Sequence, residues 1–280
     1  MLIRAALLVV WALVGVAPAA AQGTLQKIQR EGYVRVGFPN QVPYAYANEK
    51  GQLTGADAEI AKLVIDKMGI KSMDGVLTEF AALIPGLRAS RFDIVLAMFI
   101  NPTRCAQVAF SEPIYRIGQG IVVKSGNPLA VRNYDDLVTN DKVRIAVMAG
   151  AVQSTYLKKL GVPDARVSAY PDGPSAIAAV KADRADVFTI SNLPARRLLE
   201  TAGPSAGLAL VPDMPDPVID GKPGRGYDGF AFRQEDTELL AAFNRALAEV
   251  AATPAFLAAM EPFGFTKDNL PDAKTADLCH

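Results

Sequence analysis

The stretch VLAMFINPTR, at residues 95–104, decides the fold of this chain. Its unbroken apolar run predicts a strand buried on both faces, and the Asn-Pro step predicts that the strand ends in a loop before a helix begins. Phe99, Thr103 and Arg104 therefore leave the strand close together. Because a guanidinium can hold a carboxylate through two parallel hydrogen bonds, this strand end predicts a pocket for a small organic anion or zwitterion.

Alternating strand and helix patterns lie on both sides of this stretch. Apolar periodicity predicts first-half strands at residues 33–38, 76–80 and 92–98, with helices between them. After an extended apolar run at 115–124 the pattern restarts, with predicted strands at 143–148, 166–170, 185–190 and 227–232, an irregular segment at 203–228, and closing helices at 237–253 and 254–260. The β-α-β rhythm in both halves predicts an α/β protein with mostly parallel sheets.

Two such units, with one strand leading out of the first and another leading back, predict two lobes joined by a two-stranded hinge. We expect lobe 1 to comprise residues 22–125 and 229–280, and lobe 2 to comprise residues 126–228. Ligands of open α/β sheets bind beyond the carboxyl ends of the strands. Two such edges placed face to face form a cleft that closes on its ligand by lobe movement.

The charge balance argues against nucleic acid and anionic membranes as partners. The chain has 280 residues with 29 acidic and 29 basic side chains, and no basic run follows its first few positions. Either partner would require a concentrated positive face. Half of the residues are apolar, which is enough for a full hydrophobic core.

Residues 1–21 have the features of a secretory signal peptide. Arg4 precedes an apolar run at residues 5–16, and Ala19 and Ala21 satisfy the small-x-small rule for cleavage before Gln22. The alternative is a membrane anchor, which is disfavoured because the run is shorter than the ~20 apolar residues that span a bilayer. We therefore expect an exported protein.

Cys105 and Cys279 are the two cysteines of the chain. In an oxidising compartment an even pair predicts a disulfide, which would hold the C-terminal tail beside Arg104. Two free thiols are the alternative.

The sequence offers little for acid–base or nucleophilic catalysis. Its single histidine, His280, is the last residue, and the patterns H-E-x-x-H, C-x-x-C, G-x-S-x-G and the phosphate-binding loop do not occur. We therefore expect a binding protein that is not an enzyme and that uses no cofactor or metal.

From about residue 24 to the end, the chain resembles the bacterial family 3 extracellular solute-binding proteins of ABC importers, and most of all the branch that binds ectoine and hydroxyectoine. The stretches that carry this resemblance are VGFPNQVPYAY at 36–46, LTEF at 77–80, LIPGL at 83–87, RFDI at 91–94, PTRC at 102–105, VAFSEP at 108–113 and the tail ending in DLC at 277–279. The resemblance implies a two-lobed periplasmic binding protein of the type II-like class, acting as a monomer and docking on a permease in the inner membrane.

In that family three aromatic rings surround the cationic part of the solute, and an arginine binds its carboxylate. The resemblance assigns the rings to Tyr44, Phe80 and Phe99 and the arginine to Arg104. Each ring has an alternative interpretation as ordinary core, and Arg104 as a surface charge at a helix start. A cation gains ~0.5–2 kcal/mol from each favourable ring face.

Two positions depart from the family pattern. Gln41 stands where the ectoine branch carries an acidic residue that pairs with the positive ring of the ligand. A neutral hydrogen bond contributes about 1 kcal/mol, against about 1.5–3 kcal/mol with a charged partner, so affinity for a cation should fall or the ligand should differ. Ser191 stands where relatives that bind α-amino acids carry an aspartate for the amino group, which favours a quaternised or ring-embedded nitrogen.

The second lobe is expected to complete the site with backbone and polar groups. The N–H groups of Gly150, Ala151 and Val152 open a helix and can meet an anion. Asn192 and Asp172 follow strand ends and are candidates for the same cleft.

The sequence therefore predicts a periplasmic solute-binding protein that captures ectoine, hydroxyectoine or a similar small zwitterion by lobe closure. The alternatives are a binding protein for another solute, such as a betaine or a modified or polar amino acid, a dehydratase-type enzyme on the same scaffold, and the sensor module of a receptor.

Overall fold

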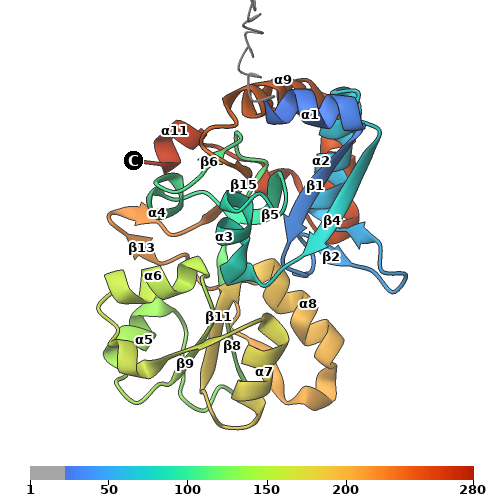
Figure 1. The fold of residues 1–280 in the computed structure, drawn as a ribbon. Coiled ribbons are helices and arrows are strands. Elements are labelled where there is room, and N and C mark those ends of the chain that lie inside the picture. The colour runs from blue at the N-terminus through green and yellow to red at the C-terminus, as the bar shows by residue number, and fades with distance from the viewer. Residues whose placement is uncertain (1–22) are drawn as a thin grey trace, which may run out of the picture.

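A computed structural model describes residues 23–280 and shows two lobes, one above the other in Figure 1. The predicted signal peptide, residues 1–21, lies outside the described residues. Each lobe has its own sheet with helices on both faces, so the predicted α/β architecture with two lobes is confirmed. No helix within residues 23–280 is long and apolar enough to cross a membrane.

Lobe 1 is built on a six-stranded sheet. Its strands, in spatial order, are β4 (Ser72–Leu77), β1 (Tyr33–Phe38), β5 (Ile94–Phe99), β15 (Gly226–Phe232) and β6 (Ala109–Phe110), with β7 (Tyr115–Ile117) also paired to β15. β1 is parallel to β4 and β5, whereas β15 is antiparallel to β5. Every residue of β5 is buried, as its apolar run predicts.

Helices cover both faces of the lobe 1 sheet, and each face has its own hydrophobic cluster. One face carries α1 (Thr24–Glu31), α2 (Ala56–Lys67), α9 (Thr237–Ala251) and α10 (Pro254–Met260). The other carries α3 (Leu83–Arg88), the short α4 (Pro102–Cys105) and α11 (Thr275–Leu278). A small hairpin of β2 (Tyr46–Ala47) and β3 (Leu53–Thr54) lies beside β4 (Figure 1).

Lobe 2 is built on a five-stranded sheet. Its strands, in spatial order, are β10 (Val167–Tyr170), β9 (Ile145–Met148), β11 (Val187–Ser191), β8 (Gln119–Lys124) and β12 (Leu208–Leu210). One face packs against α5 (Tyr134–Thr139) and α6 (Val152–Lys159), and the other against α7 (Gly173–Lys181) and α8 (Asn192–Ala202).

The chain crosses between the lobes at Gly118 and returns through residues 211–225. The extended run at 115–124, expected as one element of lobe 1, is divided at Gly118 into β7 in the first sheet and β8 in the second. The crossing therefore lies earlier than the expected boundary at residue 125. The return segment contains the ribbon of β13 (Val218–Ile219) and β14 (Lys222–Pro223), and β15 enters the first sheet at Gly226, before the expected residue 229.

Two local expectations differ from the structure. The strand expected at 76–80 is β4, which ends at Leu77, and Phe80 begins the 3-10 helix η1 (Phe80–Ala82), in which the Ala82 N–H donates to the Glu79 carbonyl at 2.9 Å. The helix α8 directly after β11 was not expected. Pro194 lies in its first turn, where a missing N–H costs no intrahelical hydrogen bond.

Candidate functional site

Arg104 projects from α4, which begins where β5 ends. Pro102 occupies the first turn of this helix, and the Asn101 side chain caps it by accepting a hydrogen bond of 3.0 Å from the Arg104 N–H. The Arg104 side chain is buried. Its Nη1 donates to the Phe99 carbonyl at 2.7 Å and its Nη2 to the Gly150 carbonyl of lobe 2 at 3.0 Å. Arg104 therefore joins the two lobes.

The guanidinium of Arg104 keeps its charge in this buried position. Burial lowers its pKa to about 10, and the nearby Asp228 opposes that shift. Because this pKa lies far above 7, Arg104 is a cation at neutral pH. A guanidinium has five N–H donors, so the two bonds to carbonyls leave donors for a carboxylate.

A small pocket lies between the lobes beside Arg104. Most of the predicted site residues line it, and the others are apolar residues of three strands and one amide. The lining residues are Gln41, Tyr44, Phe80, Ala97, Phe99, Arg104, Met148, Ala151, Val152, Gln153, Ile190 and Ser191.

The three predicted rings are held in place by protein groups on one side. Tyr44 stacks on Tyr115 with ring centroids 5.6 Å apart and meets Phe99 edge-on at 6.1 Å. The guanidinium carbon of Arg104 lies 5.3 Å from the centroid of the Phe80 ring, a cation–π contact. Gly226 packs against Phe99 so closely that a Cβ there would lie 2.3 Å from a ring carbon. The rings therefore form a preorganised wall.

The hydroxyl of Tyr44 and the side chain of Ser191 form the polar end of the pocket. Tyr44 is buried, and its hydroxyl has no hydrogen-bond partner among the described residues. Burial raises the pKa of Tyr44 well above its ordinary value, and the neighbouring Ser191 partly opposes the shift. Both groups therefore remain neutral hydrogen-bonding groups at physiological pH.

Three of the expected lobe 2 residues, Gly150, Asn192 and Asp172, do not line the pocket. Gly150 lies at its rim with a φ of 75°, and a Cβ there would lie 3.2 Å from the Cα of Ala81 in lobe 1. Asn192 is the first residue of α8, and its amide nitrogen lies beside Gly118. Asp172 instead caps α7 by accepting a hydrogen bond from the Ser175 N–H.

Four lining residues were not predicted from the sequence. Ala97, Met148 and Ile190 lie in strands and have the appearance of ordinary core, so no local signal separates them from it. Gln153 is the second residue of α6 and donates from Nε2 to Oε1 of Gln119 at 2.8 Å, with both side chains buried. Its position in the first turn of α6 was the signal that could have found it.

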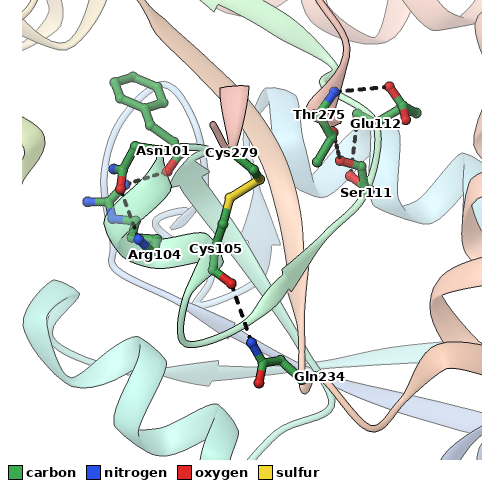
Figure 2. Close-up of a disulfide and its surroundings, with 9 residues drawn as sticks. Asn101, Arg104, Cys105, Ser111, Glu112, Gln234, Thr275 and Cys279 are labelled. Atoms are coloured by element: carbon green, nitrogen blue, oxygen red, sulfur yellow. Dashed lines mark hydrogen bonds between the residues drawn. A yellow bond between two sulfur atoms is a disulfide. The ribbon is translucent and has the colours of Figure 1, made fainter. Parts of the chain in front are cut away.

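A disulfide between Cys105 and Cys279 fixes the C-terminal tail beside α4, as Figure 2 shows. The Cα atoms are 5.7 Å apart, so the predicted pairing is present and the alternative of two free thiols is not. The tail is also held where Thr275 donates from Oγ1 to the Ser111 carbonyl and from its N–H to Oε2 of Glu112 at 3.3 Å. The disulfide thus ties the tail to α4, and the Thr275 hydrogen bonds tie it to the segment that follows β6.

The family model of the bacterial extracellular solute-binding proteins, family 3, matches residues 34–266. The chain belongs to this family. Its sequence is 36% identical to a protein of Sinorhizobium fredii named "Probable amino-acid ABC transporter periplasmic-binding protein", over 94% of this chain and 88% of that one. As a family 3 binding protein of this ABC-transporter type, it has a small solute as its ligand and a membrane permease as its partner.

Two solved structures resemble the whole two-lobed fold. EhuB in complex with hydroxyectoine superposes with a TM-score of 0.83 at 29% identity, covering 92% of this chain and 98% of that one. An ancestral amino acid-binding protein, described as a precursor of cyclohexadienyl dehydratase, superposes with a TM-score of 0.73 at 28% identity, covering 86% of this chain and 99% of that one.

Proposed function

We propose that this protein captures ectoine, hydroxyectoine or a similar small zwitterion by closure of its two lobes. The observation that carries the proposal is a buried guanidinium, with donors to spare, in the wall of a small pocket that also contains three aromatic rings. A carboxylate would accept from Arg104 at one side, and a delocalised cation would lie against the rings. The likeness to EhuB, a structure solved with hydroxyectoine, supports the same solute class.

The polar residues of the pocket support a solute without a primary ammonium group. Ser191 is buried at the end of β11 and offers a neutral hydroxyl where an ammonium would need a carboxylate. Gln41 also lines the pocket and is neutral. Its backbone is fixed by reciprocal hydrogen bonds with Ala45.

Another solute is the first alternative, because the Sinorhizobium fredii relative is named for amino acids. A dehydratase-type enzyme has less support. The residues that line the described pocket include no histidine and no carboxyl group, so a general acid or base would have to come from a tyrosine or from the solute itself.

We also propose that residues 1–21 direct export to the periplasm and that the mature protein acts there as a monomer. The periplasmic naming of the relative and the disulfide in this chain support that compartment.

Isothermal titration calorimetry of the mature protein tests the proposal with ectoine, hydroxyectoine, glycine betaine, proline betaine, lysine and glutamate. We expect the tightest binding with an ectoine and no measurable binding of lysine or glutamate. No heat with either ectoine, together with tight binding of an amino acid, would contradict it. The Arg104→Ala variant is the control with a disabled pocket. The heat measured with this variant gives the heat of dilution, which is subtracted from the heat measured with the wild-type protein.

A further inference from the structure

The pocket wall supplies charge for only one end of a zwitterion. Among the described residues that line it, Arg104 is the single fully charged side chain. Arg104 would pair with the carboxylate of the solute. The positive group of the solute would contact only aromatic rings and neutral polar groups of the wall. A site that selects for a zwitterion needs a negative charge within electrostatic reach.

A buried carboxylate lies directly behind two residues of the wall. Asp57, in the first turn of α2, accepts a hydrogen bond from the Ala97 N–H at 2.7 Å and another from the Tyr115 hydroxyl at 2.7 Å. Ala97 lines the pocket, and Tyr115 stacks on Tyr44, which also lines it. The Asp57 carboxylate is thus separated from the solute space by one layer of residues and is fully shielded from water.

A second buried carboxyl group, Asp228 of β15, pairs with the first. It lies in register with Phe99 on one side and, on the other, with Tyr115, whose hydroxyl bonds to Asp57. No donor group of residues 23–280 bonds to its oxygens. Burial and the charge of Asp57 raise the pKa of Asp228 well above its ordinary value.

The pair therefore holds one proton and one negative charge. Two adjacent buried carboxylates cannot both ionise. Burial raises the pKa of Asp57 too, but the hydrogen bonds from Tyr115 and the Ala97 N–H oppose that rise, so we assign the proton to Asp228. The other titratable groups that face the pair are the hydroxyls of Tyr44 and Tyr115 and the guanidinium of Arg104.

We propose that the Asp57–Asp228 pair is the counter-charge for the positive part of the solute, and that it makes the site prefer a zwitterion to a plain carboxylate. This inference rests on the proposed function. Because water is excluded from the site, a negative charge one residue layer away attracts the cation of the solute strongly. In bulk water the same attraction would be screened. The pair also takes the role that an acidic residue at position 41 would otherwise have, with the charge behind the wall instead of in it.

The test compares two solutes of similar size in the double variant Asp57→Asn/Asp228→Asn. Both substitutions are needed because either carboxyl group alone can carry the charge. The probes are ectoine and cyclohexanecarboxylate, a ring carboxylate without a cation, with affinities from calorimetry and competition. We expect ectoine to bind about tenfold more weakly, or worse, and cyclohexanecarboxylate to bind as well as before or better.

Asp186→Asn is the matched control, because it removes one negative charge from lobe 2 at the end of the sheet away from the pocket. It should leave both affinities unchanged. Equal loss of both probes in the double variant, or no loss of ectoine, would overturn the counter-charge role while leaving the proposed function intact. A wild-type protein that binds no zwitterion would overturn both.

Infrared spectroscopy of the wild-type protein gives a second test if the double variant does not fold. The shared proton predicts a carbonyl band of a buried protonated carboxyl group, assigned by its absence in Asp228→Asn. Ectoine should shift this band because its cation lies close to the pair, and cyclohexanecarboxylate should shift it less. A band that does not respond to ectoine would contradict the inference.

Discussion

The two lobes are the same construction used for two different tasks. In lobe 1 the strands run in the order β4, β1, β5, β15, β6, and in lobe 2 in the order β10, β9, β11, β8, β12. In each sheet the first three strands are parallel and the fourth is antiparallel to the third. The lobes therefore share one topology, although their sequences do not repeat.

The same ion pair recurs at equivalent places in both sheets. Arg35 of β1 donates from its backbone N–H, Nε and Nη2 to the carboxylate of Asp93, just before β5. Arg144, just before β9, donates from the same three groups to Asp186, just before β11. Both arginine–aspartate pairs lie toward the ends of the strands that point away from the cleft, and each pair joins two neighbouring strands.

The lobes differ in what they bring to the pocket. Lobe 1 supplies the buried arginine and all three rings, whereas lobe 2 supplies small or apolar side chains, one serine and one amide. This asymmetry indicates that recognition of the solute belongs to lobe 1 and that lobe 2 closes the site over it. The five predictions that follow test how the two lobes differ, in stability and in solute binding.

The largest expected effect is a difference in how much the two ion pairs contribute to the free energy of unfolding. Asp93 is buried and also contacts the buried Arg233 at 3.4 Å, whereas Arg144 is half exposed. Asp93→Ala should lower the free energy of unfolding by about 3 kcal/mol, because it removes the charge-assisted hydrogen bonds of Arg35 and one of the two carboxylates beside the buried Arg233, which keeps Asp236 at 2.7 Å. Asp186→Ala should cost about 1 kcal/mol or less. Urea denaturation measures both, and equal losses would mean that the lobes do not differ in this respect.

The same pair predicts a pH dependence. Burial alone would raise the pKa of Asp93, but the hydrogen bonds and charge of Arg35 and the charge of Arg233 outweigh it, so the pKa is lowered. A carboxyl group whose pKa is lower in the folded state stabilises the fold above its ordinary pKa of about 4. This contribution should be lost as the pH falls through the lowered value, and Asp93→Ala should remove that part of the acid dependence.

Arg104→Ala should cause the next largest effect, a loss of solute affinity of about 100-fold or more. Two charge-assisted hydrogen bonds to a carboxylate contribute about 1.5–3 kcal/mol each. Calorimetry measures the affinity, and Arg132→Ala is the matched control, because Arg132 is an exposed lobe 2 arginine paired with Asp136. Retained affinity in Arg104→Ala would show that the arginine is only structural.

Gly150→Ala should weaken binding about tenfold by keeping the lobes apart. Its φ of 75° disfavours a side chain, and the added Cβ would lie 3.2 Å from the Cα of Ala81. Gly161→Ala is the control, since its φ of 90° imposes similar strain but no atom lies within 4 Å. X-ray scattering should show a bound state that stays extended, and equal effects of the two variants would assign the loss to strain.

Gln41→Glu should have the smallest effect, a tightening of ectoine binding by about fivefold, which corresponds to about 1 kcal/mol. The substitution adds a charge-assisted partner to the lobe 1 wall. Gln52→Glu, in the β2–β3 turn, adds the same charge to lobe 1 outside the described pocket. Unchanged or weaker binding of ectoine by Gln41→Glu would mean that the amide does not face the cation.

The sequence predicted most elements because their patterns are local. The strand at 33–38 and the helix at 254–260 have the expected bounds, and the apolar run of β5 is the buried centre of its sheet. The boundary at Gly118 was missed because the apolar run continues through it, and only the pairing partners reveal that β7 and β8 belong to different sheets.

The site was harder to derive than the fold. Its arginine follows from a local pattern, but Tyr44, Phe80 and Ser191 come from three separate segments, and a resemblance to a family was needed to connect them. Asp57 and Asp228 lie 171 positions apart and look like ordinary acidic residues at a helix start and in a strand. Their pairing depends on the return of β15 to the first sheet, which no local pattern encodes.

The disulfide between Cys105 and Cys279 also determines how the protein would bear mechanical load. It encloses 174 positions of the chain, and all strands of lobe 2 lie inside that covalent loop. Force applied to the two ends in an optical trap would pass through the sulfur bridge and bypass lobe 2. Adding a reductant should release about 600 Å of hidden contour length, at ~3.3–3.6 Å per residue, as lobe 2 and the enclosed strands and helices of lobe 1 unravel.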